Sequence, residues 1–162
     1  MPQEIERKFL VTGDGWRARI ERRLDIRQGY LSLEAERAVR VRVLAGADKI
    51  EARLTVKGAM EGIARPEYEY PIPVEDAEEL LAHLCIRPLI EKRRHIVPWG
   101  GLDWEIDEFF GENAGLIVAE VELDAADTEI SLPAWVGADV TSDARYANAA
   151  LVRQPYQQWR QK

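Results

Sequence analysis

The sequence predicts a mainly β domain of the α+β class, in which eight antiparallel strands form a barrel or a sandwich. Two observations carry this prediction. Apolar and polar residues alternate with period two over most of the 162 residues, which is typical of strands. Turn residues separate several of these stretches, so short connections are expected to join neighbouring strands. No linker rich in Gly, Ser or Pro divides the chain, so residues 1–162 are expected to form a single domain.

Eight alternating stretches are expected to be strands. Gly58 follows the fourth stretch, and prolines stand at both ends of the fifth, where strands tolerate them. The pair Gly100-Gly101 predicts a hairpin turn between the sixth and the seventh. The expected strands cover residues 4–11, 24–33, 38–44, 50–57, 66–73, 87–97, 102–109 and 116–123.

Helices are expected between and after the strands. Residues 75–84 place their leucines on one helical face, and residues 14–20 are expected to form a shorter helix. Thr141-Ser142-Asp143 offers N-cap residues for a C-terminal helix that runs to about Arg153. Pro155 is expected to end this helix.

Composition excludes several classes of protein. A net charge of −7 and a pI of about 5.0 argue against nucleic-acid binding by bulk charge. A single cysteine, Cys85, rules out an internal disulfide and a Cys-cluster zinc site, and the two histidines, His83 and His95, argue against a His-built metal site. No stretch is long enough to span a membrane, and the N-terminus lacks a signal-peptide core, so a cytoplasmic protein is expected.

Charged residues share one face of each expected strand, and they are sorted by sign. A solvated sheet face is the simplest interpretation, because with 31% charged residues a charged pair at i and i+2 arises by chance at about one position in ten. Sorting by sign argues against it, since like charges side by side are unfavourable without opposite charge across from them. The cations are Lys8, Arg40, Arg42, Lys57, Lys92 and Arg94, and the acids are Glu4, Glu6, Glu67, Glu69, Asp107, Glu120 and Glu122.

If these faces line an eight-stranded barrel, the interior is wide enough for one small ligand. Arginine and lysine suit phosphate oxygens, whereas clustered carboxylates suit hard divalent cations such as Mg²⁺ or Mn²⁺. One or two such ions would offset the charge of a polyphosphate. The residues therefore predict a metal-dependent polyphosphate site and leave the polyphosphate open.

The same residues resemble the signature of the CYTH superfamily, the triphosphate tunnel metalloenzymes. The resemblance begins with Glu4-x-Glu6-x-Lys8, extends to about residue 153, and looks most like the small bacterial inorganic triphosphatases. The further motifs, in order, are Arg40-x-Arg42, Leu54-Thr55-Val56-Lys57-Gly58, Glu67-x-Glu69, Lys92-x-Arg94, Glu105-Ile106-Asp107, Glu120-x-Glu122 and Asp143-x-Arg145-Tyr146-x-Asn148.

This resemblance implies an eight-stranded antiparallel β-barrel tunnel, closed at one end by a C-terminal helix that carries Arg145. It implies that triphosphate is held by Lys8, Arg40, Arg42, Lys57, Lys92, Arg94 and Arg145. It implies that Mg²⁺ or Mn²⁺, as one or two ions, is held by Glu4, Glu6, Glu69, Asp107, Glu120 and Glu122. Glu67 matches the motif without an assigned metal role.

The expected reaction is the metal-dependent hydrolysis of inorganic triphosphate to pyrophosphate and phosphate. The resemblance leaves open a hydrolase of nucleoside or thiamine triphosphate and a class IV adenylate cyclase. A non-catalytic polyphosphate-binding module and a purely structural β domain are further alternatives. His95 is expected to point outward and, like the five tryptophans, to serve packing. Helices cover part of the apolar outer faces, and a homodimer would cover the rest.

Overall fold

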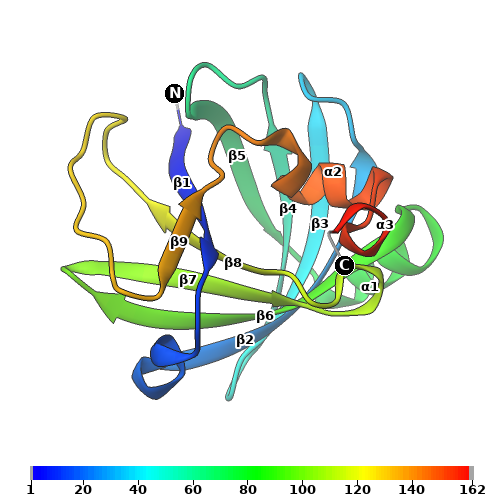
Figure 1. Cartoon of the computed structure of the whole chain (residues 1–162). Coiled ribbons are helices and arrows are strands. Elements are labelled where there is room, and N and C mark those ends of the chain that lie inside the picture. Colours follow the sequence, from blue (N-terminus) through cyan, green and yellow to red (C-terminus); the bar gives the residue numbers. More distant parts are fainter. Residues whose placement is uncertain (1, 161–162) are drawn as a thin grey trace.

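In the computed structural model, which describes residues 2–160, eight antiparallel strands close into a barrel (Figure 1). This arrangement confirms the predicted fold class. Residues 1 and 161–162, the ends of the expected single domain, lie outside the described residues. The barrel strands are β1 (Gln3–Val11), β2 (Arg22–Ser32), β3 (Ala38–Ala45), β4 (Ile50–Lys57), β5 (Ala64–Ile72), β6 (Ile86–Trp99), β7 (Leu102–Phe109) and β8 (Ile117–Glu122).

The strands follow the order β5-β4-β3-β2-β6-β7-β8-β1, and a pairing between β1 and β5 completes the ring. This closing pairing is short, since residues 3–5 of β1 pair with residues 64–66 of β5. A ninth strand, β9 (Val136–Asp139), pairs with β1 at Phe9 and Val11, beyond the part that β5 covers. The sequence does not predict β9, because four residues are too few to show a period-two pattern.

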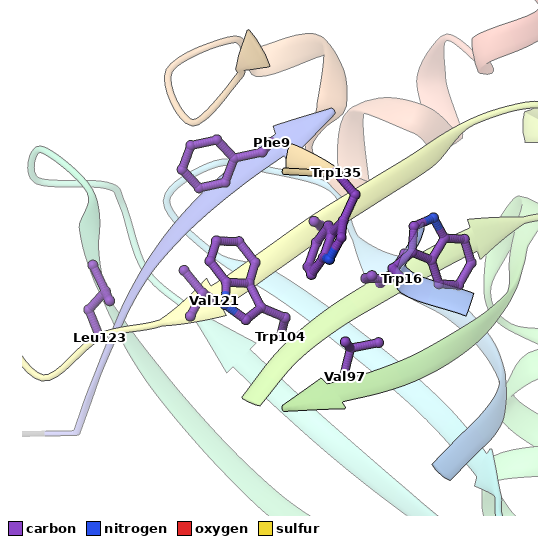
Figure 2. Packing of buried hydrophobic residues seen from close by; sticks show 9 residues of the cluster. Phe9, Trp16, Val97, Trp104, Val121, Leu123 and Trp135 are labelled. Atoms are coloured by element: carbon purple, nitrogen blue, oxygen red, sulfur yellow. The ribbon is translucent and has the colours of Figure 1, made fainter. Parts of the chain in front are cut away.

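The main hydrophobic cluster lies on the outside of the barrel wall (Figure 2). It packs Phe9, Trp104 and Trp135 with ring centroids 5.8 Å and 5.5 Å apart. On the same side, Trp16 of the 3-10 helix η1 (Gly15–Arg19) covers His95 at a centroid distance of 5.0 Å. His95 therefore points outward and serves packing, as predicted, and the expected helix at 14–20 is a single 3-10 segment.

Helix α1 (Val74–His83) covers a second outer cluster. Its buried residues Ala77 and Leu81 pack against Val41 and Val43 on the outer face of β3. These positions alternate with Arg40 and Arg42 along the strand, so covering the outer face turns the arginines toward the interior. The observed helix differs by one residue at each end from the predicted 75–84.

The C-terminal segment closes one end of the barrel, as predicted. Leu151 and Val152 of α2 (Asn148–Arg153) pack against inward-facing apolar residues, among them Ile90, Phe109 and Leu116. The expected single helix is divided into η3 (Ala144–Tyr146) and α2. A further helix, α3 (Tyr156–Trp159), follows Pro155 and is not predicted from the sequence. The Asp143 carboxylate caps η3, accepting a hydrogen bond from the Arg145 amide at 3.1 Å.

Two local features complete the fold. Gly100 and Gly101 both have positive φ, +61° and +79°, which fits the type I′ turn expected between β6 and β7. A short 3-10 helix, η2 (Gly111–Asn113), precedes β8. Among the described residues, no helix is long and apolar enough to cross a membrane.

Candidate active site

The barrel interior encloses a cavity of about 700 Å³ with a largely charged lining. This volume lies within the range of about 300–1,000 Å³ that small-molecule sites occupy. The cavity also borders α2. The helix contributes the small side chains of Ala149 and Ala150 to the lining, so it does not fill the cavity. Of the predicted site residues, the lining contains Glu4, Glu6, Lys8, Arg40, Arg42, Lys57, Glu69, Lys92, Arg94, Glu120 and Glu122.

Four of the cations form what we term the basic wall: Arg40 and Arg42 of β3, and Lys92 and Arg94 of β6. Strands β3 and β6 flank β2, which lies opposite β1 in the ring of eight strands. All four residues are buried. The alternation of β3 and β6 therefore delivers two cations from each strand to the same side of the interior.

The basic wall carries more positive charge than the protein neutralises. Burial and the charges of Arg40 and Arg94 lower the pKa of Arg42 to about 9. Burial, with the charges of Arg94 and Arg42, lowers the pKa of Lys92 to about 7, even though Asp107 acts in the opposite direction. The depressed pKa values of Arg42 and Lys92 mean that a bound anion would stabilise both cations. Arg94 differs: burial lowers its pKa, but the charges of Asp107 and Glu105 outweigh burial and hold the pKa well above its ordinary value.

Four carboxylates form the acidic wall: Glu4 and Glu6 of β1, Glu67 of β5 and Glu122 of β8. These three strands are neighbours, with β1 between β8 and β5. The register places Glu6 directly opposite Glu122 across the β1–β8 pair. The acidic wall therefore faces the basic wall across the cavity.

Most of the acidic wall is uncompensated. Burial and the charges of Glu120 and Glu4 raise the pKa of Glu6 well above its ordinary value. Burial and the neighbouring Glu4 raise the pKa of Glu67 to about 7 and also raise that of Glu122. Such shifts report crowded negative charge, which a bound cation would relieve.

Two lysines on this side contact the carboxylates. Lys57 Nζ lies 2.6 Å from Glu4 Oε2 and 3.4 Å from Glu67 Oε2. Burial raises the pKa of Glu4, but hydrogen bonding to Glu67 and the charge of Lys57 outweigh it and hold the pKa well below its ordinary value. Lys8 Nζ lies 3.5 Å from Glu120 Oε1.

The donor set of the acidic wall fits a hard divalent cation. Carboxylate oxygens are the ligands that Mg²⁺ and Mn²⁺ prefer. The buried Glu4 Oε2 makes no hydrogen bond of acceptable geometry, even to Lys57. Among residues 2–160, however, no three acidic, His or Cys side chains are already placed to hold an ion together. The carboxylates must therefore turn away from Lys57 to share one ion.

Asp107 and Glu69 each accept hydrogen bonds from neighbouring cations. Asp107 is fully buried and lies outside the cavity lining; it accepts from Lys92 at 2.6 Å and from Arg94 at 2.8 Å and 2.9 Å. Glu69 accepts from Arg53 at 2.9 Å and from Thr55 at 3.0 Å. This arrangement makes both residues counter-ions of the cations, and the metal-binding role expected for them stays a prediction.

Arg145 is the other site residue that the structure separates from the cavity. It lies on η3 rather than on the closing helix, its side chain is 57% exposed, and it pairs with Asp143 at 2.7 Å. Its guanidinium stacks 4.7 Å from the centre of the Trp159 ring. Because α3 supplies Trp159, the unpredicted helix explains why Arg145 turns outward. Its expected role in binding phosphate stays a prediction.

The structure adds polar residues that the sequence analysis does not single out. Glu105 and Arg53 line the cavity. Glu105 is two residues from Asp107, and Arg53 is two residues from Thr55, so the period-two pattern could have placed both on the inward face. Gln28 and Asn148 bond to Arg42 and Lys92 inside the barrel. Neutral amides carry no charge signal in a sequence, although Asn148 belongs to the C-terminal motif.

Comparison with known proteins gives this site a family. The CYTH domain matches residues 2–156. The chain belongs to the CYTH family. A curated CYTH relative, an inorganic triphosphatase of Acetivibrio thermocellus, is 45% identical over 161 residues, which are 99% of this chain and 100% of the relative. An inorganic triphosphatase of Nitrosomonas europaea is 37% identical over 155 residues, covering 91% and 95% of the two chains.

Solved structures agree with the CYTH assignment. A crystal structure of an inorganic triphosphatase superimposes with a TM-score of 0.60 at 35% identity, covering 94% of this chain and 95% of that one. A putative adenylyl cyclase from Hippeastrum with a dominant triphosphatase activity shares the fold at a TM-score of 0.59 and 15% identity, covering 75% and 80%. The barrel fold thus occurs in chains of low sequence similarity.

Proposed function

We propose that this chain hydrolyses inorganic triphosphate to pyrophosphate and phosphate, with Mg²⁺ or Mn²⁺ as the cofactor. One observation carries the proposal: an acidic wall, most of whose negative charge is uncompensated, faces across one cavity a basic wall that Asp107 and Glu69 compensate only in part. A ligand that satisfies both must present negative oxygens on one side and a hard cation on the other. A metal complex of triphosphate has this form. The names of the curated relatives support the same substrate.

The basic wall would hold the phosphate oxygens. Arg40 and Arg42 present planar guanidinium groups, which match phosphate oxygens in pairs, and Lys92 contributes a point charge. Arg94 is already engaged by Asp107, so it would add charge while keeping its orientation. Lys8 and Lys57 extend from the opposite side and would contact the remaining phosphate oxygens once their carboxylate partners turn to the metal.

The acidic wall would hold the metal through Glu4, Glu6, Glu67 and Glu122, with Glu120 nearby. Bound there, a divalent ion supplies Lewis-acid polarisation of a phosphoryl oxygen and lowers the pKa of a bound water. Water adds to a terminal phosphorus as the P–O bond to the bridging oxygen breaks, and the basic wall stabilises the charge that the leaving pyrophosphate acquires. The preformed cations need no reorganisation during this step.

We also propose that the protein is cytoplasmic, that it does not bind nucleic acid and that it forms a homodimer. Exposed apolar side chains such as Ile50 and Leu84, at 60% and 65% exposure, offer surface that a second copy would cover. Light scattering of the purified protein tests the dimer. A monomeric mass at micromolar concentration would contradict it.

Phosphate release tests the proposed reaction. Inorganic triphosphate, ATP and thiamine triphosphate are each incubated with the protein in Mg²⁺, in Mn²⁺ or in EDTA. We expect release from inorganic triphosphate in either metal and none in EDTA, with pyrophosphate as the second product. Faster turnover of ATP or thiamine triphosphate would reassign the substrate. Cyclic AMP formed from ATP would replace hydrolysis with a cyclase reaction, and tight triphosphate binding without turnover would support the binding module.

A further inference from the structure

Gln28 is a fully buried neutral residue on β2, between the two strands that carry the basic wall. Its Oε1 accepts a hydrogen bond of 2.7 Å from Arg42 Nε. Its Nε2 donates a hydrogen bond of 2.8 Å to Asn148 Oδ1. The oxygen and the nitrogen of this amide therefore both have partners. One of these partners, Arg42, is a cation of the basic wall.

Asn148 is the first residue of α2, the helix that closes the barrel. Its Oδ1 accepts from Gln28 and also from Lys92 Nζ at 3.0 Å. The two amides thus connect Arg42 on β3 with Lys92 on β6, and they fasten the closing helix to the same unit.

The direction of every hydrogen bond in this unit is determined. Arginine and protonated lysine can only donate, so Arg42 and the charged form of Lys92 must each meet an amide oxygen. The oxygen of Gln28 is used by Arg42, which leaves its amino group for Asn148 Oδ1. No alternative orientation of either amide satisfies all four residues, so each cation has one preferred position.

Gln28 and Asn148, the amide partners of Arg42 and Lys92, are neutral, whereas a carboxylate in their place would weaken anion binding. Elsewhere the cations are held by carboxylates, as Lys92 and Arg94 are by Asp107. A second carboxylate in the position of Gln28 or Asn148 would cancel positive charge that faces the cavity. An amide supplies the same directional contact and leaves the charge of Arg42 and Lys92 available to an anion.

We propose that Gln28 and Asn148 are positioning residues that hold Arg42 and Lys92 in the geometry needed to bind one phosphoryl group of the substrate. This inference rests on the proposed phosphate-binding role of the basic wall. The unit acts through its cations, so loss of either amide lets Arg42 or Lys92 move. The outer hydrophobic clusters, together with the packing of Leu151 and Val152 against the interior, keep the barrel closed.

The test compares Gln28→Met, Asn148→Leu and the double variant, which remove the hydrogen bonds at similar side-chain volume. Gln157→Met is the matched control, because Gln157 donates a side-chain hydrogen bond to Ala114 O on the exposed surface, outside the barrel. We measure kcat and KM with inorganic triphosphate, the affinity for triphosphate in EDTA by calorimetry, and the urea midpoint of unfolding.

We expect each single variant to lose about 10- to 100-fold in kcat/KM, mainly through KM, with a matching loss of triphosphate affinity in EDTA. The double variant should lose no more than the worse single variant, because the two amides act as one unit. Gln157→Met should match the wild type.

Several results would overturn the inference. Unchanged KM and affinity in the single variants would do so, as would fully additive losses in the double variant. A lower kcat at constant KM, in parallel with a lower urea midpoint, would assign the amides a structural role only. If Gln28→Met does not fold, Asn148→Leu, at the half-buried helix start, decides alone. A wild type that binds triphosphate without hydrolysing it would refute the proposed function, and the calorimetric comparison would still decide the role of the amides.

Discussion

Lys92 and Asp107 form an ion pair of 2.6 Å in which neither side chain has any exposed surface. Arg94 binds the same carboxylate with two further hydrogen bonds, at 2.8 Å and 2.9 Å. Burial raises the pKa of Asp107, but the charges of Arg94 and Lys92 outweigh it and hold the pKa well below its ordinary value. The carboxylate therefore compensates part of the basic wall from behind and leaves the side that faces the cavity open.

Asp107→Asn should destabilise the fold. Removing one partner of a buried ion pair leaves the other charges unpaired, at a cost of about 3–5 kcal/mol. Glu105→Gln is the control on the same strand and the same inward face. Burial raises the pKa of Glu105, so its ionised form adds no stability to lose. Urea denaturation at pH 7 compares the two; equal midpoints would show that Asp107 is not the counter-ion that we describe.

Arg42→Ala should separate activity from stability. Burial and like charge disfavour the Arg42 cation, whereas its loss leaves the buried Gln28 Oε1 without a donor; these effects oppose each other, so the urea midpoint should change little. The kcat/KM for inorganic triphosphate should fall about 100-fold, as when one group that stabilises a transition state is removed. Arg93→Ala, on the outer face of β6, is the control and should keep wild-type activity. An Arg42→Ala enzyme with normal kcat/KM would remove this residue from the site.

Glu122→Gln should weaken metal binding without harming the fold. Burial and the charge of Glu4 raise the pKa of Glu122, so replacing the carboxyl with an amide relieves repulsion in the metal-free protein. We expect the Mn²⁺ concentration for half-maximal activity to rise about 10-fold or more. Glu79→Gln on the exposed side of α1 should not change it. An unchanged Mn²⁺ requirement in Glu122→Gln would place the metal elsewhere.

Stability of the metal-free protein should fall as the pH rises from about 5 to 7. The pKa of Glu67 is raised from 4.5 to about 7 in the folded state, so the folded protein binds this proton more tightly than the unfolded chain. The resulting stability is present below about pH 4.5 and is lost as the pH rises through about 7. Glu67 contributes about 2 kcal/mol to this change, after allowance for solvent screening of a side chain that is 25% exposed.

Urea midpoints in EDTA at about pH 5, 6 and 7 measure this effect. Glu67→Gln should make the profile less steep, because one of the carboxyls with a raised pKa is gone. Glu91→Gln removes an exposed carboxylate on β6 and should keep the wild-type slope. A Glu67→Gln protein with the same slope as the wild type would assign the pH dependence to other groups.

The strands could be predicted because the barrel is polar inside and apolar outside. Period two is then strong on both faces, and the predicted limits of 50–57 and 102–109 agree with the observed strands β4 and β7. Elements without a periodic pattern could not be found this way. β9 has four residues, and α3 has a single turn whose place depends on Trp159 packing against Tyr146 and Tyr156.

The site could be predicted as a set of residues but not as a set of roles. Period two places Glu105, Asp107 and Glu120 on the same inward face. It does not show which of these carboxylates pairs with a cation of the protein and which faces the cavity. Depth decides this: Asp107 lies between Lys92 and Arg94, whereas Glu105 borders the cavity. Arg145 turns outward because of aromatic residues that lie beyond the matched motif.

The short pairing of residues 3–5 with residues 64–66 makes one side of the ring easier to open than the rest. A closed ring of strands opens locally where the fewest hydrogen bonds join two strands. The backbone amide hydrogens of this segment should therefore exchange with solvent through an opening of lower free energy than elsewhere in the ring. Glu4 and Glu67 stand on the two sides of that joint. An ion shared between them would cross-link the strands and slow the exchange. With the metal held as we propose, the empty ring would be the more flexible state and the loaded ring the more rigid one, so that binding of the ligand and closure around it would be coupled.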